Sequence, residues 1–395
     1  MTRLLSDVDG KISHVLLCLA GPRDIRRVAS IVATFDKEVE ITIACHHDFG
    51  KQLSSQTWAV AKNLLRGNLS VPEQLAVSLP GGRRINLLPM HEDPWIWAQD
   101  LIHVLEKKIL VPSISETENV LSDIGRLSKK TSSGLLKQQF WIDHQFTVAE
   151  ATEMVGLGNS DGGDLIVCGE TVFVGDGMIG QHLKYGMNQR NKYVRHGTYA
   201  KAKDHVLRWL SALEEERTFC VLPFQADHLD MVLTPISEDC LALADIEQTI
   251  DALRLSPNVS IQDRYKTYAS ALQDLAGAIS SQCVGVRVIR IPCVPPLVCN
   301  GRVLNHFTSY NNIVQEKFRF SGGNVKHRAY IPIYSHSPEL FRYVNPANWS
   351  GFLKSAIDAY RAIGLEVRNV PFLLEHATHF GGGLRCSVKV LERAS

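Results

Sequence analysis

The chain of 395 residues lacks several features that mark particular classes of protein. Its nine cysteines form no CxxC pair, which argues against a zinc ribbon or a thioredoxin-type motif. No apolar run approaches the roughly 18 residues that a membrane span needs. Arg3, Asp7 and Asp9 precede any apolar run, unlike a secretory signal. We therefore expect a cytoplasmic protein with reduced thiols and no membrane partner.

The chain also lacks an excess of charge of either sign, because 42 Lys and Arg residues face 41 Asp and Glu residues and the formal net charge is only +1. This balance argues against a nucleic-acid-binding surface that covers the whole molecule. Apolar residues make up 45% of the chain and charged residues 21%, as in a globular protein with a substantial core. We expect no nucleic-acid partner.

Strand-like and helix-like segments alternate along the whole chain, and no Pro/Gly/Ser-rich linker divides it. The pattern predicts one α/β domain, residues 1–395, built from several strand-strand-helix-strand modules. The expected strands are 15–19, 40–45, 85–88, 108–112, 140–146, 165–168, 171–174, 219–222, 231–234, 240–244, 284–291, 329–333, 365–370 and 387–391. The expected helices are 24–35, 52–66, 148–155, 205–216, 269–280 and 349–363.

Near the C-terminus, three consecutive glycines, Gly381–Gly383, are followed by Cys386. Residues without a Cβ let the backbone pack against a flat group or turn its amides toward one. Val388–Leu391 then alternates like a short strand, which places Cys386 at the mouth of a strand. Such a thiol is a candidate nucleophile, although most cysteines in soluble proteins are small buried hydrophobes.

Two other stretches place carboxylates beside apolar runs. Asp100 follows Trp97 and stands just before an apolar run. Asp161 and Asp164 bracket a glycine pair that enters the predicted strand 165–168. Either stretch can bind a cationic group, but each also has a local explanation, as a turn cap or an Asx turn.

His228 and Asp230 stand two residues apart before the predicted strand at 231–233. Both side chains project from the same face if the strand includes them. The carboxylate can then orient and charge the imidazole, which favours an acid–base role. A divalent ion is the competing ligand, but no His-rich cluster completes such a site, so we predict no metal and no cofactor.

These stretches together supply a thiol, an imidazole and several carboxylates. Carboxylates around a nucleophile predict a cationic, planar substrate with many donors, and a guanidinium group with its five N–H donors fits. Guanidinium is a poor electrophile, so its conversion needs both a thiolate and a proton donor for the departing amine.

The order WxxD, DGGD, HxD and GGxxxC resembles the guanidino-group-modifying enzymes, or pentein superfamily, which includes the arginine, agmatine and peptidylarginine deiminases, the dimethylarginine dimethylaminohydrolases and the amidinotransferases. The matching segments are Trp97–Asp100, Asp161–Asp164, His228–Asp230 and Gly381–Cys386. Ser309–Asn312 is similar to an asparagine-bearing segment of agmatine deiminases.

The resemblance implies a five-bladed α/β propeller of ββαβ units around a central active-site channel. It also implies that Cys386 attacks the guanidinium carbon, while His228 protonates the leaving amine and later activates water. Asp100 and Asp230 would hold the guanidinium nitrogens, and Asp161 would orient His228 or the substrate.

The resemblance implies four further substrate-binding residues: Trp97, Asn312, Arg385 and Asp164. Of these, Asp164 more often has a structural role in such a motif. Arg385 replaces the histidine that usually precedes the cysteine in agmatine deiminases, and it either tunes the thiol or lies on the surface. After Phe173-Val174-Gly175, the chain departs from the arginine deiminase pattern, which puts recognition of the substrate tail in doubt. Two basic stretches, 184–203 and 317–328, are either lids over the channel or ordinary solvated loops.

The resemblance leaves the reaction open between two classes. A hydrolase would replace a guanidino nitrogen by water, and an amidinotransferase would pass the amidino group to an amine. A member that only binds its ligand is a third alternative. The expected partner is a small guanidino substrate or the arginine side chain of a peptide, and a homodimer is compatible with the sequence.

Overall fold

The computed structural model of the protein describes residues 3–21, 24–46, 85–90, 94, 97–105, 108–112, 141, 145–151, 162–180, 198–214, 216–224, 228–253, 260–261, 264–294, 296–299, 302–305, 308–320, 322–335, 342, 345–373 and 382–394. The predicted helix at 52–66 and Asp161 lie outside these residues.

Five small sheets in this part of the chain share one pairing pattern. In each, the first strand pairs antiparallel with the second, and the second pairs parallel with the third. Four of the sheets are β4 (His103–Leu105), β5 (Lys108–Pro112) and β6 (Thr147–Ala151); β7 (Leu165–Cys168), β8 (Thr171–Gly175) and β9 (Thr218–Leu222); β10 (Leu233–Ser237), β11 (Cys240–Asp245) and β13 (Arg287–Val294); and β17 (Val314–Arg319), β18 (Val325–Ser335) and β19 (Glu366–Leu373).

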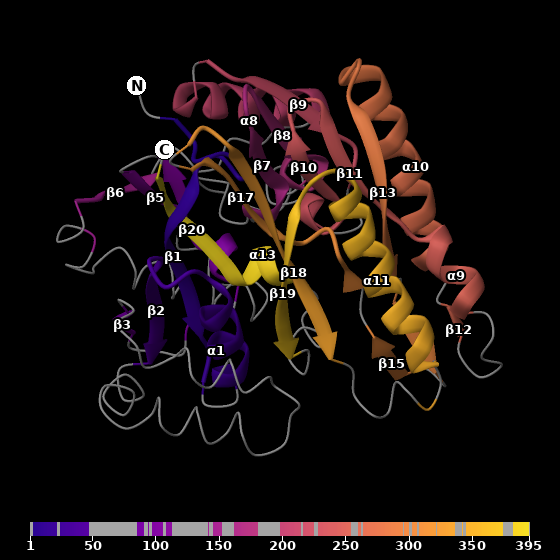
Figure 1. Cartoon of the computed structure of the whole chain (residues 1–395). Helices are drawn as coiled ribbons and strands as arrows, with labels where there is room; N and C mark the ends of the chain where they lie inside the picture. The colour runs from indigo at the N-terminus through magenta and orange to yellow at the C-terminus, as the bar shows by residue number, and fades with distance from the viewer. Residues whose placement is uncertain are drawn as a thin grey trace.

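The fifth sheet joins the two ends of the chain. It contains β20 (Val388–Ala394), β1 (Lys11–Leu19), β2 (Glu40–His46) and β3 (Ile85–Met90), in that order. β20 pairs antiparallel with β1, with Val390 opposite Val15, so that the N- and C-terminal strands lie side by side (Figure 1). Because Cys386 stands two residues before β20, this pairing brings the candidate nucleophile near the N-terminal segment.

Helices supply the crossovers that parallel strand pairs require. Figure 1 shows them outside the sheets, whereas the short α13 (Leu384–Ser387), which carries Cys386, lies in the middle of the molecule. The crossover helices are α1 (Ile25–Thr34), α8 (Tyr199–Leu213), α9 (Glu247–Leu253), α10 (Arg264–Gln282) and α11 (Pro346–Ala362). Small elements complete the fold, namely β12 (Ser260–Ile261), β14 (Leu297–Cys299), β15 (Arg302–Asn305), β16 (Thr308–Ser309) and the 3-10 turns η2 (Ala98–Asp100), η4 (Gly162–Asp164) and η5 (Leu229–Met231).

Most of the predicted elements are confirmed, including the hairpin of β7 and β8. The strand expected at 140–146 and the helix expected at 148–155 are wrong, because Trp141 is helical and β6 is a strand at Thr147–Ala151. The helix expected to begin at 205 begins at Tyr199, since the Thr198 side chain accepts a hydrogen bond from the Lys201 amide. None of the described helices is long and apolar enough to cross a membrane.

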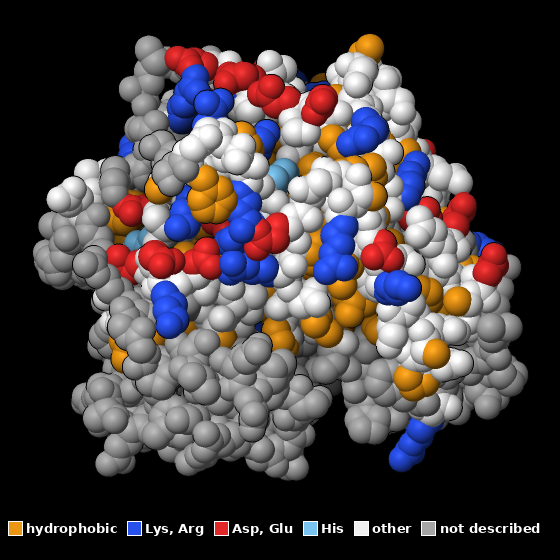
Figure 2. Space-filling model, in the orientation of Figure 1, with side chains coloured by type: hydrophobic (Ala, Val, Ile, Leu, Met, Phe, Trp, Pro, Cys, Tyr) orange, Lys and Arg blue, Asp and Glu red, His pale blue; other side chains and the backbone are white. Residues whose placement is uncertain are grey.

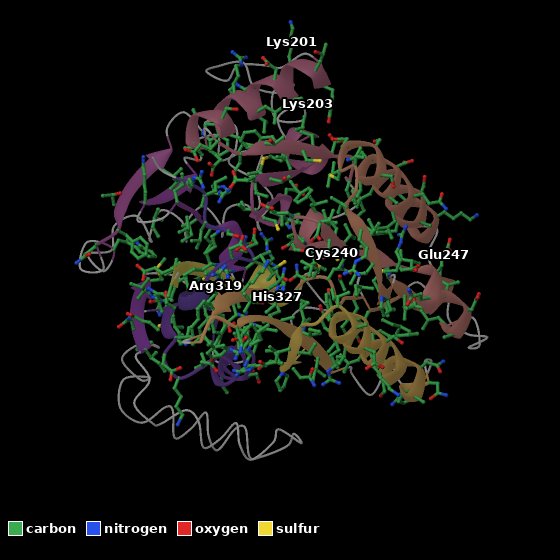
Figure 3. All side chains as sticks on the ribbon, turned by 45° about the horizontal axis from the view of Figure 1, so that its top comes forward. Lys201, Lys203, Cys240, Glu247, Arg319 and His327 are labelled. Atoms are coloured by element: carbon green, nitrogen blue, oxygen red, sulfur yellow. The ribbon has the colours of Figure 1, made fainter. Side chains whose placement is uncertain are left out.

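Most of the basic stretch 317–328 is not a loop, since 317–319 belong to β17 and 325–328 to β18, which pair as a hairpin. Within it Arg328 is buried and pairs with Glu316 at 2.5 Å and Asp36 at 2.7 Å. In the other stretch, Lys201 and Lys203 belong to α8 at the outer edge of the molecule (Figure 3). Figure 2 shows acidic and basic side chains mixed on the visible face, in keeping with the net charge of +1.

Candidate active site

Cys386 lies in α13, directly before β20, as the sequence predicts for a thiol at the mouth of a strand. It is 4% exposed. The Asn312 side chain brackets it: Asn312 Nδ2 donates to the Sγ at 3.2 Å, and the Cys386 amide donates to Asn312 Oδ1 at 3.1 Å. One side-chain amide thus holds both the thiol and the backbone of the cysteine, which fixes where the sulfur points.

A buried carboxylate lies next to this thiol. Asp230 is 1% exposed, and its Oδ2 lies 3.7 Å from the Cys386 Sγ. The other oxygen, Oδ1, is buried and accepts no hydrogen bond from any described residue. Since a buried carboxylate oxygen without a donor is costly, Oδ1 is a ready acceptor for the N–H group of a ligand.

His228 lies close to the Asp230 carboxylate, because both residues belong to the turn around η5. It precedes η5, which contains Asp230, and the predicted strand begins two residues late, as β10 at Leu233, so His228 and Asp230 project from a turn and not from one face of a strand. A Cβ built on Gly163 would lie 2.8 Å from His228 Nδ1 and 2.9 Å from Asp230 Oδ1. Gly163 therefore lies directly against both groups, and only glycine leaves them room.

Asp164 lies beneath the turn that carries these residues. Its Oδ1 accepts a hydrogen bond from the Leu229 amide at 3.0 Å, and its carboxylate fills the space in front of Gly175 and Gly177. The side chain is 1% exposed. In this position Asp164 anchors η5 to η4 and thereby sets the place of His228 and Asp230.

The glycine bend before Cys386 packs against a flat side chain, as its sequence predicts. Gly382 has φ +152°, and a Cβ there would lie 2.6 Å from the ring of Trp97. A Cβ on Gly383 would lie 2.5 Å from Asn312 Oδ1. The two glycines thus let Trp97 and Asn312 approach the backbone of the cysteine segment.

Several solved structures share this arrangement of the chain. Agmatine deiminase from C. jejuni is 13% identical with a TM-score of 0.57, over 100% of this chain and 98% of that one. Its cysteine-to-serine variant with bound substrate gives 0.58 over the same shares, also at 13% identity. A provisionally assigned arginine deiminase from Porphyromonas gingivalis is 13% identical with a TM-score of 0.52, over 98% of both chains. The chain has the pentein fold.

No family model matches the sequence, and no curated protein matches it significantly. At identities of 13%, the likeness to the solved structures establishes the pentein fold alone. The chemistry must therefore be argued from the residues of this chain.

Arg385 occupies an unexpected place in this pentein fold. It is buried rather than on the surface, and its Nη1 donates to Asp230 Oδ2 at 2.7 Å. Its Nε and Nη2 donate to Asp7 Oδ1 at 3.1 and 3.0 Å. The remaining N–H groups face the carbonyl oxygens of Leu165 at 2.9 Å and Gly162 at 3.5 Å. All five donors of the guanidinium are thus used by protein oxygens, and none is left over for a substrate.

Asp7 is the residue of this site that sequence reasoning missed. It stands 378 positions before Arg385. No motif surrounds it, and a single carboxylate near the N-terminus carries no signal that distinguishes it from Asp9. Only the pairing of β1 with β20 reveals the relation.

Of the nine predicted site residues, hydrogen bonds and close contacts bring together Cys386, Asn312, Asp230, Arg385 and His228, with Asp164 beneath them and Trp97 against the glycine bend. Asp100 belongs to η2, but its side chain lies outside the described part of the structure, as does all of Asp161. Within that part, no group of three or more His, Cys, Asp or Glu side chains is arranged to hold a metal ion.

Proposed function

We propose that this protein is a cysteine-dependent hydrolase of the guanidino group, of deiminase or dihydrolase type. The observation that carries the proposal is the buried Cys386 thiol 3.7 Å from the Asp230 carboxylate, whose second oxygen has no donor among the described residues. A thiol beside a carboxylate suits guanidinium, because the carboxylate binds its positive charge and its poorly electrophilic carbon needs a strong nucleophile such as a thiolate.

The reaction divides into two halves. The Cys386 thiolate forms a bond to the guanidinium carbon, and one C–N bond breaks as His228 protonates the departing amine. A thiouronium-type intermediate remains on the sulfur. His228 then removes a proton from water, the water oxygen bonds to the same carbon, and the C–S bond breaks to release a ureido product.

The other residues position the two reactants. Asp230 Oδ1 accepts an N–H group of the substrate. By their place in the motifs, Asp100 is assigned to other N–H groups of the guanidinium, and Asp161 to orienting His228 or the substrate. Asn312 holds the sulfur toward the substrate carbon. The five repeated sheets are read as the blades of a propeller, with α13 and Cys386 at its central channel.

The names of the structural neighbours support the substrate class. An agmatine deiminase and an arginine deiminase act on guanidino compounds by name, and the substrate-bound form of the former carries serine in place of a cysteine. We therefore propose a substrate among free arginine, agmatine, a methylated arginine and a peptidyl arginine.

Intact-protein mass spectrometry after rapid acid quench tests the proposal. The protein is mixed with arginine, agmatine, methylarginine or an arginyl peptide, and ammonia and ureido products are measured in parallel. We expect an adduct on Cys386 together with ammonia or amine release, both absent in Cys386→Ala. Cys240→Ala is the matched control, since it removes another buried thiol.

The outcomes separate the alternatives. Turnover by Cys386→Ala at the wild-type rate would sink the mechanism. An adduct that persists until an amine is added would replace hydrolysis by amidino transfer. A wild-type protein that forms neither adduct nor product with any of the four compounds would refute the proposed substrate class.

A further inference from the structure

The N-terminal segment threads between three of the sheets, beneath the candidate site. The Leu5 amide donates to the Val104 carbonyl, Asp7 N to the Val167 carbonyl, and Gly10 N to the Lys317 carbonyl, all at 2.8 to 3.0 Å. These acceptors belong to or flank β4, β7 and β17. Asp7 is therefore held at the centre of the fold by its own backbone.

Both carboxylate oxygens of Asp7 are engaged there. Oδ2 accepts from the Val167 amide at 2.7 Å, and Oδ1 accepts two bonds from Arg385. Arg385 in turn binds Asp230 Oδ2. Asp7, Arg385 and Asp230 thus form a row of alternating charge. Its last carboxylate, that of Asp230, lies 3.7 Å from the Cys386 sulfur.

The net charge of this row of three side chains depends on Asp7. Burial opposes the charge on Arg385, but Asp7 and Asp230 outweigh it and raise the pKa of the guanidinium above its ordinary value. Among these three side chains one cation then stands between two anions, a net charge of −1, while Arg393 on β20 faces Asp7 from the other side and donates to its carbonyl oxygen at 2.9 Å. Without Asp7, Arg385 and Asp230 would form a neutral pair, and the negative charge that this side of the site offers to a cationic substrate would be lost.

We propose that Asp7 is a positioning residue: by sharing Arg385, it keeps Asp230 oriented toward the substrate guanidinium and leaves the three side chains with an excess negative charge. The part of this inference that concerns the substrate rests on the proposed function. The effect of Asp7 on the Cys386 thiol does not. The negative charge that Asp7 preserves also lies close to the Cys386 sulfur, where it disfavours the thiolate.

The surroundings of Asp7 tolerate the substitution that tests this. Asp7 and Arg385 line a cavity of about 60 Å³, together with Gln99 and Asn311. The cavity is polar enough to hold water. The Asp7 side chain is 23% exposed, so Asp7→Asn can reorganise its hydrogen bonds with water without leaving an isolated buried group.

The first measurement is the alkylation of Cys386 by iodoacetamide as a function of pH, followed by mass spectrometry. In Asp7→Asn we expect the midpoint of the rate profile to move to lower pH by about 0.5 to 1 unit, because a nearby negative charge is lost. Asp7→Glu should keep the wild-type midpoint. Asp9→Asn is the matched control, since Asp9 is exposed two residues away and bonds to Ser6. A midpoint in Asp7→Asn equal to that of Asp9→Asn would overturn the inference.

The second measurement is steady-state kinetics on the guanidino substrate. Asp7→Asn should raise KM about 10-fold or more and change kcat about threefold or less, whereas Asp7→Glu should restore most of the affinity. An unchanged KM in a turning-over Asp7→Asn enzyme would overturn the inference and leave the proposed function standing. A wild-type protein with no turnover would refute the proposed function. The pH profile of Cys386 alkylation would then still test whether Asp7 acts on the site.

A separate observation concerns two thiols away from this site. The Sγ atoms of Cys220, on β9, and Cys283, just after α10, lie 3.7 Å apart. Cys220 is buried and Cys283 half-buried. Burial, and next the Cys283 thiol, raise the pKa of Cys220 to about 12, and Cys283, the more exposed of the two, is the member that a solvent reagent reaches first.

We infer that this pair is a site of reversible oxidation by a small disulfide such as oxidised glutathione. The Cys283 thiolate attacks one glutathione sulfur and expels one glutathione. Cys220, after losing its proton to solvent, attacks the Cys283 sulfur and expels the second. Two protein thiols and one oxidised glutathione thus become one protein disulfide and two reduced glutathiones. Rotation about the two Cα–Cβ bonds must bring the sulfurs from 3.7 Å to about 2 Å.

Intact mass after oxidised glutathione, in a Cys386→Ser background, tests this second proposal. We expect a loss of about 2 Da, reversed by dithiothreitol. The peptide 267–287, whose only cysteine is Cys283, should then be cross-linked. The loss should vanish in Cys283→Ser and Cys220→Ser and persist in Cys240→Ser. No loss of mass, or a loss that survives Cys283→Ser, would refute the pair as the site.

Discussion

Gly163→Ala is the sharpest structural test of the candidate site, because it adds one methyl group and removes nothing. A Cβ at this position would lie 2.8 Å from both Cβ and Nδ1 of His228 and 2.9 Å from Asp230 Oδ1. Ordinary contacts begin near 3.4 Å, so His228 must retreat by about 0.6 Å. Gly163 does not have a positive φ, so the backbone accepts alanine without strain.

The expected effect follows from this displacement. A misplacement of about 1 Å in a catalytic group costs on the order of 100-fold in rate. We therefore expect kcat/KM of Gly163→Ala to fall by about 10- to 100-fold, equivalent to about 1.4 to 2.7 kcal/mol of transition-state stabilisation. The assay is steady-state kinetics on the guanidino compound that gives the strongest wild-type signal, with a thermal melt of each variant.

Gly351→Ala provides the control. Gly351 lies on the exposed side of α11, and a Cβ there meets nothing within 4 Å. This variant should keep full activity and melt at or above the wild-type temperature, since alanine favours a helix. A folded Gly163→Ala protein with kcat/KM within threefold of the wild type would refute the assignment of His228 and Asp230 to the reaction.

Three further predictions address other parts of the structure. Asn312→Ala removes the amide that holds the Cys386 sulfur and should lower kcat about 10-fold or more in the same assay, with less effect on KM. Glu214→Ala leaves Arg217 and the Leu4 amide without their buried acceptor and should lower the free energy of unfolding in urea by about 3 kcal/mol. Burial, and next Lys389, lower the pKa of His103 to about 3, so the unfolded chain binds the extra proton and stability falls as the pH drops below about 6.5. His103→Phe should remove about 2 kcal/mol of the stability lost between pH 7 and pH 5, measured as urea midpoints.

Each of these has its own contrary result. An Asn312→Ala enzyme that keeps its kcat would show that the thiol needs no orienting amide. Glu214→Ala should be compared with Glu247→Ala, which removes an exposed carboxylate, and an equal loss in both would contradict the buried pair as its cause. If the wild type and His103→Phe lose the same stability between pH 7 and pH 5, then His103 does not bind a proton on unfolding in that range.

The local elements were predictable wherever the pattern of apolar residues is strong. β1, β2 and the β7–β8 hairpin are runs of buried aliphatic residues, and their positions agree with the sequence within a few residues. The prediction failed at residues 148–151, where a helix was expected and β6 is a strand, because a short apolar run does not distinguish a buried strand from a helix turn. The strand predicted from 231 begins only at Leu233, because the Leu229 amide bonds to Asp164 and residues 229–231 form a 3-10 turn.

The chemical inventory of the site was determined by the sequence alone. The glycine bend, Cys386, His228 and Asp230 are local motifs, and the α/β alternation is a local pattern, so both can be read without coordinates. The role of Arg385 was decided only by the tertiary structure. Beside a thiol in sequence, it had two alternatives, to tune the thiol or to lie on the surface.

The physical reason is that an ion pair depends on distance in space, not along the chain. Asp7 and Arg385 are 378 positions apart and meet because β20 pairs with β1. Arg385 and Asp230 are 155 positions apart and meet because α13 lies against η4 and the turn η5. The sequence therefore determined which groups were available, and the closing of the chain on itself decided that one guanidinium is shared between two carboxylates beside the thiol.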